Sequence, residues 1–187
     1  MNTSIRFKNC SAFFGSNIRV TMEFQLKPVS PTAIPEALER AHRYRLLGEP
    51  WQAESICLDV LAVDPGNQTA AVTLLLALTD QFCVESTPAR AREVLASIRG
   101  EYEQAYYAGI IFERSARARI RQGFRGANVK AYHEFMAAMR WYEEAQAKRP
   151  LGNDDSILRW NTCARTLMRH TELRPQPEER LEPVLDD

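Results

Sequence analysis

Few residue patterns in the chain could support catalysis or metal binding. His133 and Glu134 begin a stretch that is similar to the zinc-binding HExxH pattern, but residue 137 is an alanine, so the second metal ligand is absent. We therefore interpret this pair as part of a helix surface. Asp154 and Asp155 could act as paired carboxylates, yet carboxylates are also common at the start of a helix. The sequence predicts no catalytic residue, no metal site and no cofactor, so we expect a non-enzymatic protein.

The four cysteines indicate a reducing compartment. They lie far apart with no CxxC spacing, at Cys10, Cys57, Cys83 and Cys163. Such residues are typical of buried apolar positions or free thiols rather than of a metal site or a disulfide framework. No apolar run approaches the length of a membrane span. We expect a cytoplasmic protein without membrane contact.

A basic stretch is the constellation that stands out for binding. No acidic residue lies between Glu113 and Glu134. The candidate arm for partner binding consists of Arg114, Arg117, Arg121, Arg125 and Lys130. Arginine binds carboxylates and phosphates through its planar forked donors, so an acidic protein segment or another polyanion, such as a nucleic-acid backbone, is a candidate ligand. The alternative interpretation is a solvated charged face of a long helix.

The spacing of apolar residues predicts helices along the whole folded part and no sheet. The first hairpin runs from about Pro35 to Leu47, with Gly48 ending its first helix, and from Pro50 to Val63. Asn67 is a good N-cap for a helix that is apolar on nearly every side. Ser86 or Thr87 caps the next helix, whose inner stripe extends to Ile98.

A third hairpin is predicted to be longer than the others. Its first helix continues to Gln122, glycines at 123 and 126 indicate the turn, and its second helix returns to Pro150. The tip should project by about 12 Å at 1.5 Å per residue. Across this pair we expect Ile120, Val129 and Tyr132 to pack together, while Arg117, Arg121 and Arg125 point into water.

A final helix should begin after Asn153 or Asp154. Its predicted apolar stripe consists of Ile157, Trp160, Ala164, Leu167 and Met168. We expect Arg159, Arg165 and Arg169 to face away from the stripe, as a terminal cap on a helical stack requires.

The stretch from Leu47 to Asn67 resembles the second half of a tetratricopeptide repeat. In that family a glycine ends the first helix, as Gly48 does, an alanine follows in the second helix, as Ala53 does, and Asp-Pro and Asn close the unit. Arg99 lies 34 residues after Pro65, which is the period of the family. The third hairpin matches at Ala105, Ala108, Gly109 and Phe112, but its period is stretched by 17 residues.

This resemblance implies an all-α fold, a right-handed solenoid of about three helical hairpins with a capping helix. It also implies a protein-binding scaffold or adaptor, with a concave groove that takes a protein or peptide. The implied groove residues are Leu38, His42, Arg45, Val72, Leu76, Thr79, Tyr106 and Ile110, with Glu113 beside them. Members that grip a C-terminal carboxylate carry Lys and Asn where this chain has Leu38 and His42, which argues against that ligand. Plain packing against a neighbouring helix is the alternative for each groove residue.

The chain divides into one domain and two tails. We expect a disordered N-terminal tail over 1–33, a helical domain over 34–173, and an acidic, proline-rich disordered tail over 174–187. Met22 is an alternative to Met1 as the start of translation. The oligomeric state and the identity of the partner do not follow from the sequence.

Overall fold

The computed structural model describes residues 24–83, 87–123 and 126–175. These residues form seven α-helices and two short 3₁₀ helices and contain no strand, so the all-helical prediction is confirmed. The elements are η1 (Pro31–Ala33), α1 (Ile34–Leu46), α2 (Pro50–Val63), α3 (Gln68–Asp80), α4 (Pro88–Leu95), α5 (Glu101–Gln122), α6 (Ala127–Lys148), α7 (Asp155–Arg169) and η2 (Thr171–Leu173).

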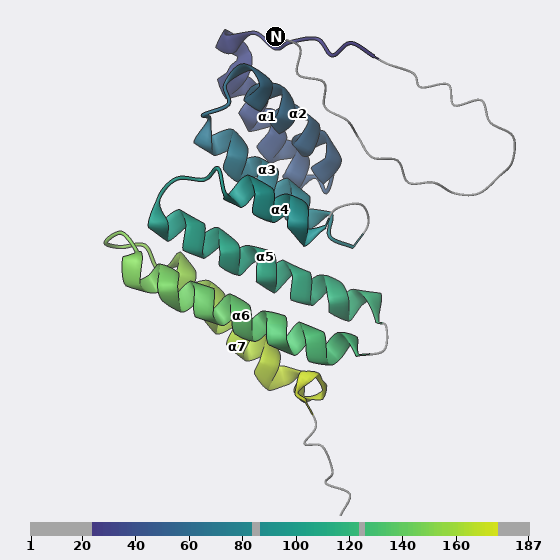
Figure 1. The fold of residues 1–187 in the computed structure, drawn as a ribbon, viewed down its shortest axis with the longest axis vertical. Helices are drawn as coiled ribbons and strands as arrows, with labels where there is room; N and C mark the ends of the chain where they lie inside the picture. Colours follow the sequence, from purple (N-terminus) through teal and green to yellow (C-terminus); the bar gives the residue numbers. More distant parts are fainter. Residues whose placement is uncertain (1–23, 84–86, 124–125, 176–187) are drawn as a thin grey trace, which may run out of the picture.

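The helices follow one another along the longest axis of the molecule, from α1 and α2 to α6 and α7 (Figure 1). Each helix packs against the next one in the chain. In addition, α1 packs against α3 and α3 packs against α5. The helices α1, α3 and α5 are therefore successive neighbours, which brings side chains of distant sequence positions together.

Most helix ends lie where the local signals predict them. The side chain of Asn67 accepts a hydrogen bond from the Ala70 backbone nitrogen at 2.9 Å, the arrangement of an N-cap. Gly123 ends α5 with φ of 63°, a left-handed conformation that glycine adopts without a steric penalty. The long third hairpin is present as α5 and α6, each of 22 residues.

The helix α4 is shorter than predicted, because it ends at Leu95 rather than near Ile98. At Ser97 and Ile98 the backbone N–H groups bond to the carbonyl three residues earlier instead of four. The Ser97 nitrogen donates to the Val94 carbonyl, and the Ile98 nitrogen donates to the Leu95 carbonyl. The Ser97 hydroxyl also donates to the Val94 carbonyl at 2.7 Å and so competes with helical bonding. Ile98 is still buried, so the apolar pattern continues beyond the last residue of α4.

The core consists mainly of two adjoining apolar clusters that share α5. Ile111 of α5 belongs to the cluster built with α1 to α4, and Ile110 belongs to the cluster built with α6 and α7. In the first hairpin, Ala41 and Ala53 are fully buried, as expected where two helices cross closely. Because α5 contacts both clusters, its position determines how the two halves of the molecule meet.

Small residues also control the contact between α5 and α6. A Cβ atom on Gly109 would lie 2.5 Å from the Tyr142 ring, closer than side chains approach one another. Along the extension, Ala116 and Ala131 are fully buried. The predicted seam is wrong at Ile120 and Val129, which are 36% and 41% exposed, whereas Tyr132 packs against the cluster that contains Ala116 and Ala131. Alanines let the two backbones approach closely, and this leaves the larger apolar side chains at the edge of the contact.

The final helix corrects two further expectations. Met168 is 69% exposed, and Cys163 is fully buried in the stripe with Ala164 and Leu167. Arg159 does not face away, because it reaches Glu113 of α5. The 3₁₀ helix η2 adds Leu173 to the core beyond the end of α7.

The predicted tails lie largely outside the described residues, at 1–23 and 176–187. Residues 24–30 form no helix, but residues 31–33, predicted as part of the N-terminal tail, form η1. Within the described part of the chain, none of the helices combines the length and apolar character needed to cross a membrane.

Candidate protein-binding site

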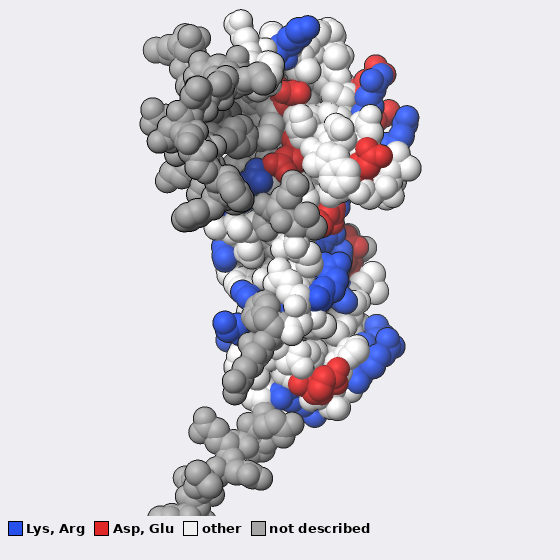
Figure 2. Space-filling view, turned by 90° about the vertical axis from the view of Figure 1, so that its right-hand side faces the viewer, with Lys and Arg blue, Asp and Glu red and all other residues white. Residues whose placement is uncertain are grey.

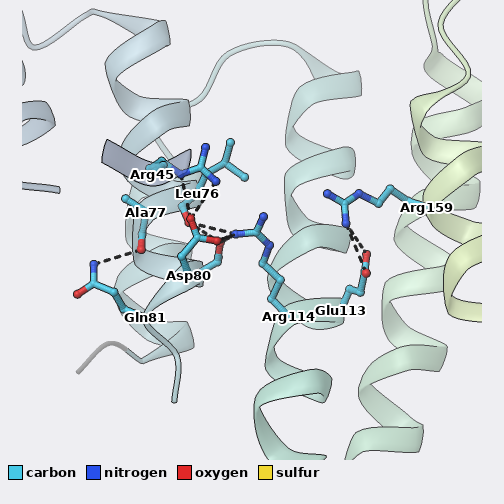
Figure 3. Close-up of polar contacts among 9 residues, drawn as sticks. Arg45, Leu76, Ala77, Asp80, Gln81, Glu113, Arg114 and Arg159 are labelled. Atoms are coloured by element: carbon cyan, nitrogen blue, oxygen red, sulfur yellow. Dashed lines mark hydrogen bonds and ion pairs between the residues drawn. The ribbon is translucent and has the colours of Figure 1, made fainter. Parts of the chain in front are cut away.

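The end of α3 holds a carboxylate that two arginines share. Asp80 is the last residue of α3, where the partial negative charge of a helix C-terminus disfavours an anion. Arg45 of α1 donates to Asp80 Oδ2 from Nε at 2.9 Å, and its Nη2 also lies 2.9 Å from that oxygen. Arg114 of α5 binds the other carboxylate oxygen. Asp80 therefore lies between guanidinium groups of the two neighbouring helices (Figure 3).

Arg114 is fixed more completely than Arg45. Besides Asp80, its Nη1 donates to the Thr79 hydroxyl at 2.7 Å and to the Leu76 carbonyl at 3.2 Å. Burial lowers the pKa of the Arg114 guanidinium; the Asp80 charge opposes this effect, and the charges of Arg45 and Arg159 add to it. Arg114 is thus a partly dehydrated cation with two other cations nearby.

Glu113, the residue before Arg114 in α5, is a buried carboxylate that faces α6 and α7. Only 2% of its side chain is exposed. It accepts hydrogen bonds from Tyr142 Oη at 2.8 Å and Arg117 Nε at 3.2 Å, and Arg159 Nη1 approaches it at 3.4 Å. Burial, followed by the Glu113 charge, raises the pKa of the Tyr142 hydroxyl above its ordinary value. Burial is the largest single effect on Arg159 and lowers its pKa, but the Glu113 carboxylate together with Tyr142 and Tyr106 outweighs it, so the net pKa is raised.

These contacts form two sets, one around Asp80 and one around Glu113. The adjacent residues Glu113 and Arg114 of α5 join the two sets into a polar chain across α1, α3, α5 and α7. We call Arg45, Arg114 and Arg159 the arginine row. Its members come from three different helices, and Figure 3 shows them on either side of Asp80 and Glu113. The row combines fixed positive charge with partial exposure, since 16% of the Arg45 side chain and 34% of the Arg159 side chain are exposed. Such an arrangement can bind an anion.

A hollow lies beside the first ion pair of this chain. It has a volume of about 350 Å³ and is lined by Arg45, Leu46, Gly48, Pro50 and Asp80. Leu46 is 89% exposed at its edge. The hollow therefore offers a charged wall and an apolar wall next to each other.

The predicted groove residues divide into accessible and buried positions. Leu38, Thr79 and Ile110 are buried and act in packing or, for Thr79, in holding Arg114. Val72, Leu76 and Tyr106 are half-buried, and Arg45 belongs to the arginine row. His42 is exposed, and its Nε2 lies 3.4 Å from the Thr73 hydroxyl of α3. Fewer residues are therefore accessible to a ligand in the groove than the sequence predicted.

The predicted arm residues do not form one basic tip. Arg114 belongs to the arginine row, and Arg117 pairs with Glu113 and lies over the Phe135 ring, with Cζ 5.7 Å from its centroid. Arg121 and Lys130 are exposed and make no ion pair with the described residues, whereas Arg125 lies outside the described residues. Figure 2 views the side on which α5 ends and shows Lys and Arg in several separate groups.

Glu134 binds side chains of α5, although we expected the His133–Glu134 pair to lie on a helix surface. Its Oε1 accepts from Arg119 Nε at 2.8 Å and from the Ser115 hydroxyl at 3.0 Å. Its Oε2 is buried and has no hydrogen-bond partner among the described residues. Glu134, which follows the basic stretch in the sequence, thus neutralises the charge of Arg119 within it.

Sequence reasoning missed Asp80 and misplaced Arg159. A signal for Asp80 was present, because it is the only ionisable residue in a helix that is otherwise apolar or uncharged. A single carboxylate at the end of such a helix indicates a cation on a neighbouring element. Nothing comparable distinguishes Arg159 from Arg165 and Arg169, since its role depends on Glu113, 46 residues away.

No model of a known protein family matches the chain, and no curated protein or solved structure with which it was compared matches it either.

Proposed function

We propose that this protein is a non-enzymatic, tetratricopeptide-like scaffold that binds another protein on the face formed by α1, α3, α5 and α7. The single observation that supports this proposal most is the polar chain from Arg45 through Asp80 to Arg114 and from Glu113 to Arg159. It joins four helices on one face and leaves donors of the arginine row within reach of solvent. Half-buried Val72, Leu76 and Tyr106 supply apolar surface beside it.

The order of the helices also supports a repeat scaffold. Three successive pairs, α1 with α2, α3 with α4 and α5 with α6, pack in sequence, and small residues such as Ala53 and Gly109 lie at the crossings. Stacked hairpins of this kind present alternate helices on a common surface. Repeat scaffolds use such surfaces for binding rather than for chemistry, which is the basis for proposing a non-enzymatic role. The proposed cytoplasmic location rests on the pattern of separate cysteines.

A nucleic-acid-contacting role remains the alternative. It would use the candidate arm, but Arg114 and Arg117 pair with Asp80 and Glu113 there. The exposed cations Arg121 and Lys130 are the part of the arm that favours this alternative among the described residues. Phosphate binding would make the interaction steeply dependent on salt.

The test is to block the face sterically without changing its charged side chains. His42→Trp adds an indole at an exposed position of α1, and Gln52→Trp adds the same group at an exposed position of α2 as the matched control. Partners captured from a lysate of the source cells and identified by mass spectrometry should be lost with His42→Trp and retained with Gln52→Trp. Equal capture by the two variants would contradict binding on the α1, α3, α5 and α7 face.

A further inference from the structure

The arginine row and the neighbouring Arg117 have more positive charge than their carboxylates neutralise. Arg45 and Arg114 share the single charge of Asp80, and Arg117 and Arg159 share the single charge of Glu113. Four guanidinium groups thus face two carboxylates. Like charges held this close are unfavourable unless an anion joins them, and the partial burial of the row weakens the screening by water.

The row also keeps hydrogen-bond donors available. A guanidinium has five N–H donors, and all the hydrogen bonds that Arg114 makes with the described residues come from Nη1. Arg45 uses Nε and Nη2 on Asp80, which leaves Nη1 without a partner among the described residues. The contacts of Arg159 with Glu113 all come from Nη1 and are long, at 3.4 and 3.5 Å, so they do not occupy the other donors of this guanidinium.

The surroundings of the row favour a peptide over a bare phosphate. The hollow of about 350 Å³ beside Arg45 and Asp80 has Leu46 and Pro50 in its wall. Leu47 and Trp51 are also exposed near this end of the first hairpin, at 65% and 54%. A ligand that fits both features has carboxylates for the arginines and apolar side chains for the hollow.

We propose that the arginine row binds an acidic segment of a partner protein, with carboxylates on Arg45, Arg114 and Arg159 and an apolar side chain in the hollow beside Leu46. This inference rests on the proposed scaffold function and names the chemistry of its ligand. The carboxylates of the partner segment would accept hydrogen bonds from the N–H groups of the arginine row that Asp80 and Glu113 do not use. Charge complementarity would then set the orientation of the segment along α1, α3, α5 and α7.

The experiment uses the full chain and three fluorescein-labelled probes of equal length. They are a peptide of alternating Glu and Leu, the corresponding peptide of Lys and Leu, and a single-stranded oligonucleotide, each titrated by fluorescence anisotropy. The row variant is Arg45→Gln with Arg159→Gln. The matched control is Arg121→Gln with Lys130→Gln, which removes the same charge from exposed positions on the α5–α6 tip.

We expect the Glu and Leu peptide to bind more tightly than the other two probes. The row variant should weaken that binding at least about tenfold, because two charge-assisted contacts are lost, while the control should change it less than about twofold. If circular dichroism shows that the row variant is unfolded, the single variant Arg159→Gln tests the proposal instead. The contacts of Arg159 are long, so their loss should not unfold the protein, and we expect this variant to weaken binding of the acidic peptide at least about threefold.

Unchanged affinity of the folded row variant for the acidic peptide would overturn the proposal. Tighter binding of the oligonucleotide, lost in the control variant, would overturn it in favour of the nucleic-acid alternative. The scaffold proposal is tested separately by His42→Trp. If that variant loses its captured partners while the acidic peptide shows no dependence on the row, only the ligand class is wrong.

Discussion

The first and third hairpins are built from the same elements but bury different kinds of group at their contact. The contact of α1 with α2 contains Ala41, Ala53 and Cys57, all fully buried, and no buried carboxylate. The contact of α5 with α6 buries alanines as well, but it also encloses Glu113 with the Tyr142 hydroxyl. The α1–α2 contact depends only on the volumes of its side chains. The α5–α6 contact depends on side-chain volume and also on the pairing of a buried charge.

This difference teaches where binding chemistry can be placed in a stack of similar hairpins. A buried carboxylate is costly to dehydrate and needs partners with good geometry. Glu113 obtains them from α6, from α7 and from Arg117 of its own helix, and so holds Arg117 and Arg159 in position. The third hairpin can therefore present oriented cations, whereas the first contributes Arg45 only at its end, next to Asp80 of α3.

The largest expected effect is the loss of the buried charge. Glu113→Ala should lower the free energy of unfolding by about 3 kcal/mol, the lower end for a broken buried ion pair, since Arg117 and Arg159 can turn towards water. Urea denaturation measures the change. Glu113→Gln, which keeps the volume and an acceptor for Tyr142, should lose clearly less. A loss below about 1 kcal/mol for the alanine variant would mean that the pairing does not specify this contact.

In the first hairpin an excess of volume should be harmful without any change of charge. Ala53→Trp should destabilise the domain by at least about 1 to 3 kcal/mol, because a fully buried crossing cannot accommodate an indole. Thermal unfolding of this variant beside Gln52→Trp, exposed on the same helix, isolates the effect of burial. An unchanged melting temperature for Ala53→Trp would show that volume does not control the α1–α2 contact.

The third hairpin should share this sensitivity to volume at Gly109. Gly109→Ala should cost about 1 to 2 kcal/mol despite the better helix propensity of alanine, because the new methyl group meets the buried Tyr142 ring. Gly66→Ala, in the turn between α2 and α3, is the control for the added methyl group, since a Cβ atom there would make only ordinary contacts at 3.7 Å or more. Denaturant titrations of both variants test the comparison, and equal stabilities would indicate that α6 shifts freely to accept the methyl group.

The first hairpin and the helix α7, which packs on the third hairpin, should behave alike towards alkaline pH, because each has a buried thiol. Burial, before any neighbouring charge, raises the pKa of Cys57 and of Cys163 from 9.0 to about 12. Between these values the unfolded chain releases the thiol protons and the folded chain keeps them. Stability should therefore fall as pH rises above 9, by at most about 1.4 kcal/mol per pH unit for each thiol.

Denaturant titrations at pH 8.5 and pH 10.5 measure this slope. Cys163→Ala should make the decline shallower than in the unmodified chain, because one of the two thiols no longer titrates. If the variant and the unmodified chain decline equally, the Cys163 thiol does not resist ionisation in the fold.

The sequence by itself determined the helices and most of their ends. Apolar spacing, the N-cap residue Asn67 and the glycine at 123 act over a few residues, so their consequences can be predicted without knowing the rest of the chain. The early end of α4 also has a local cause in Ser97, but the buried Ile98 concealed it in the pattern. The long third hairpin followed from the continued helical spacing on both sides of the turn.

Only the tertiary structure decided which charged side chains act together. The run of arginines on α5 suggested a common exposed tip, yet Arg114 pairs with Asp80, 34 residues earlier, and Arg159 pairs with Glu113, 46 residues earlier. Helical spacing states which face of its own helix a residue occupies. It does not state which helix covers that face. That depends on how closely the backbones approach at small residues such as Gly109 and Ala131, and this packing determines which carboxylate each arginine meets.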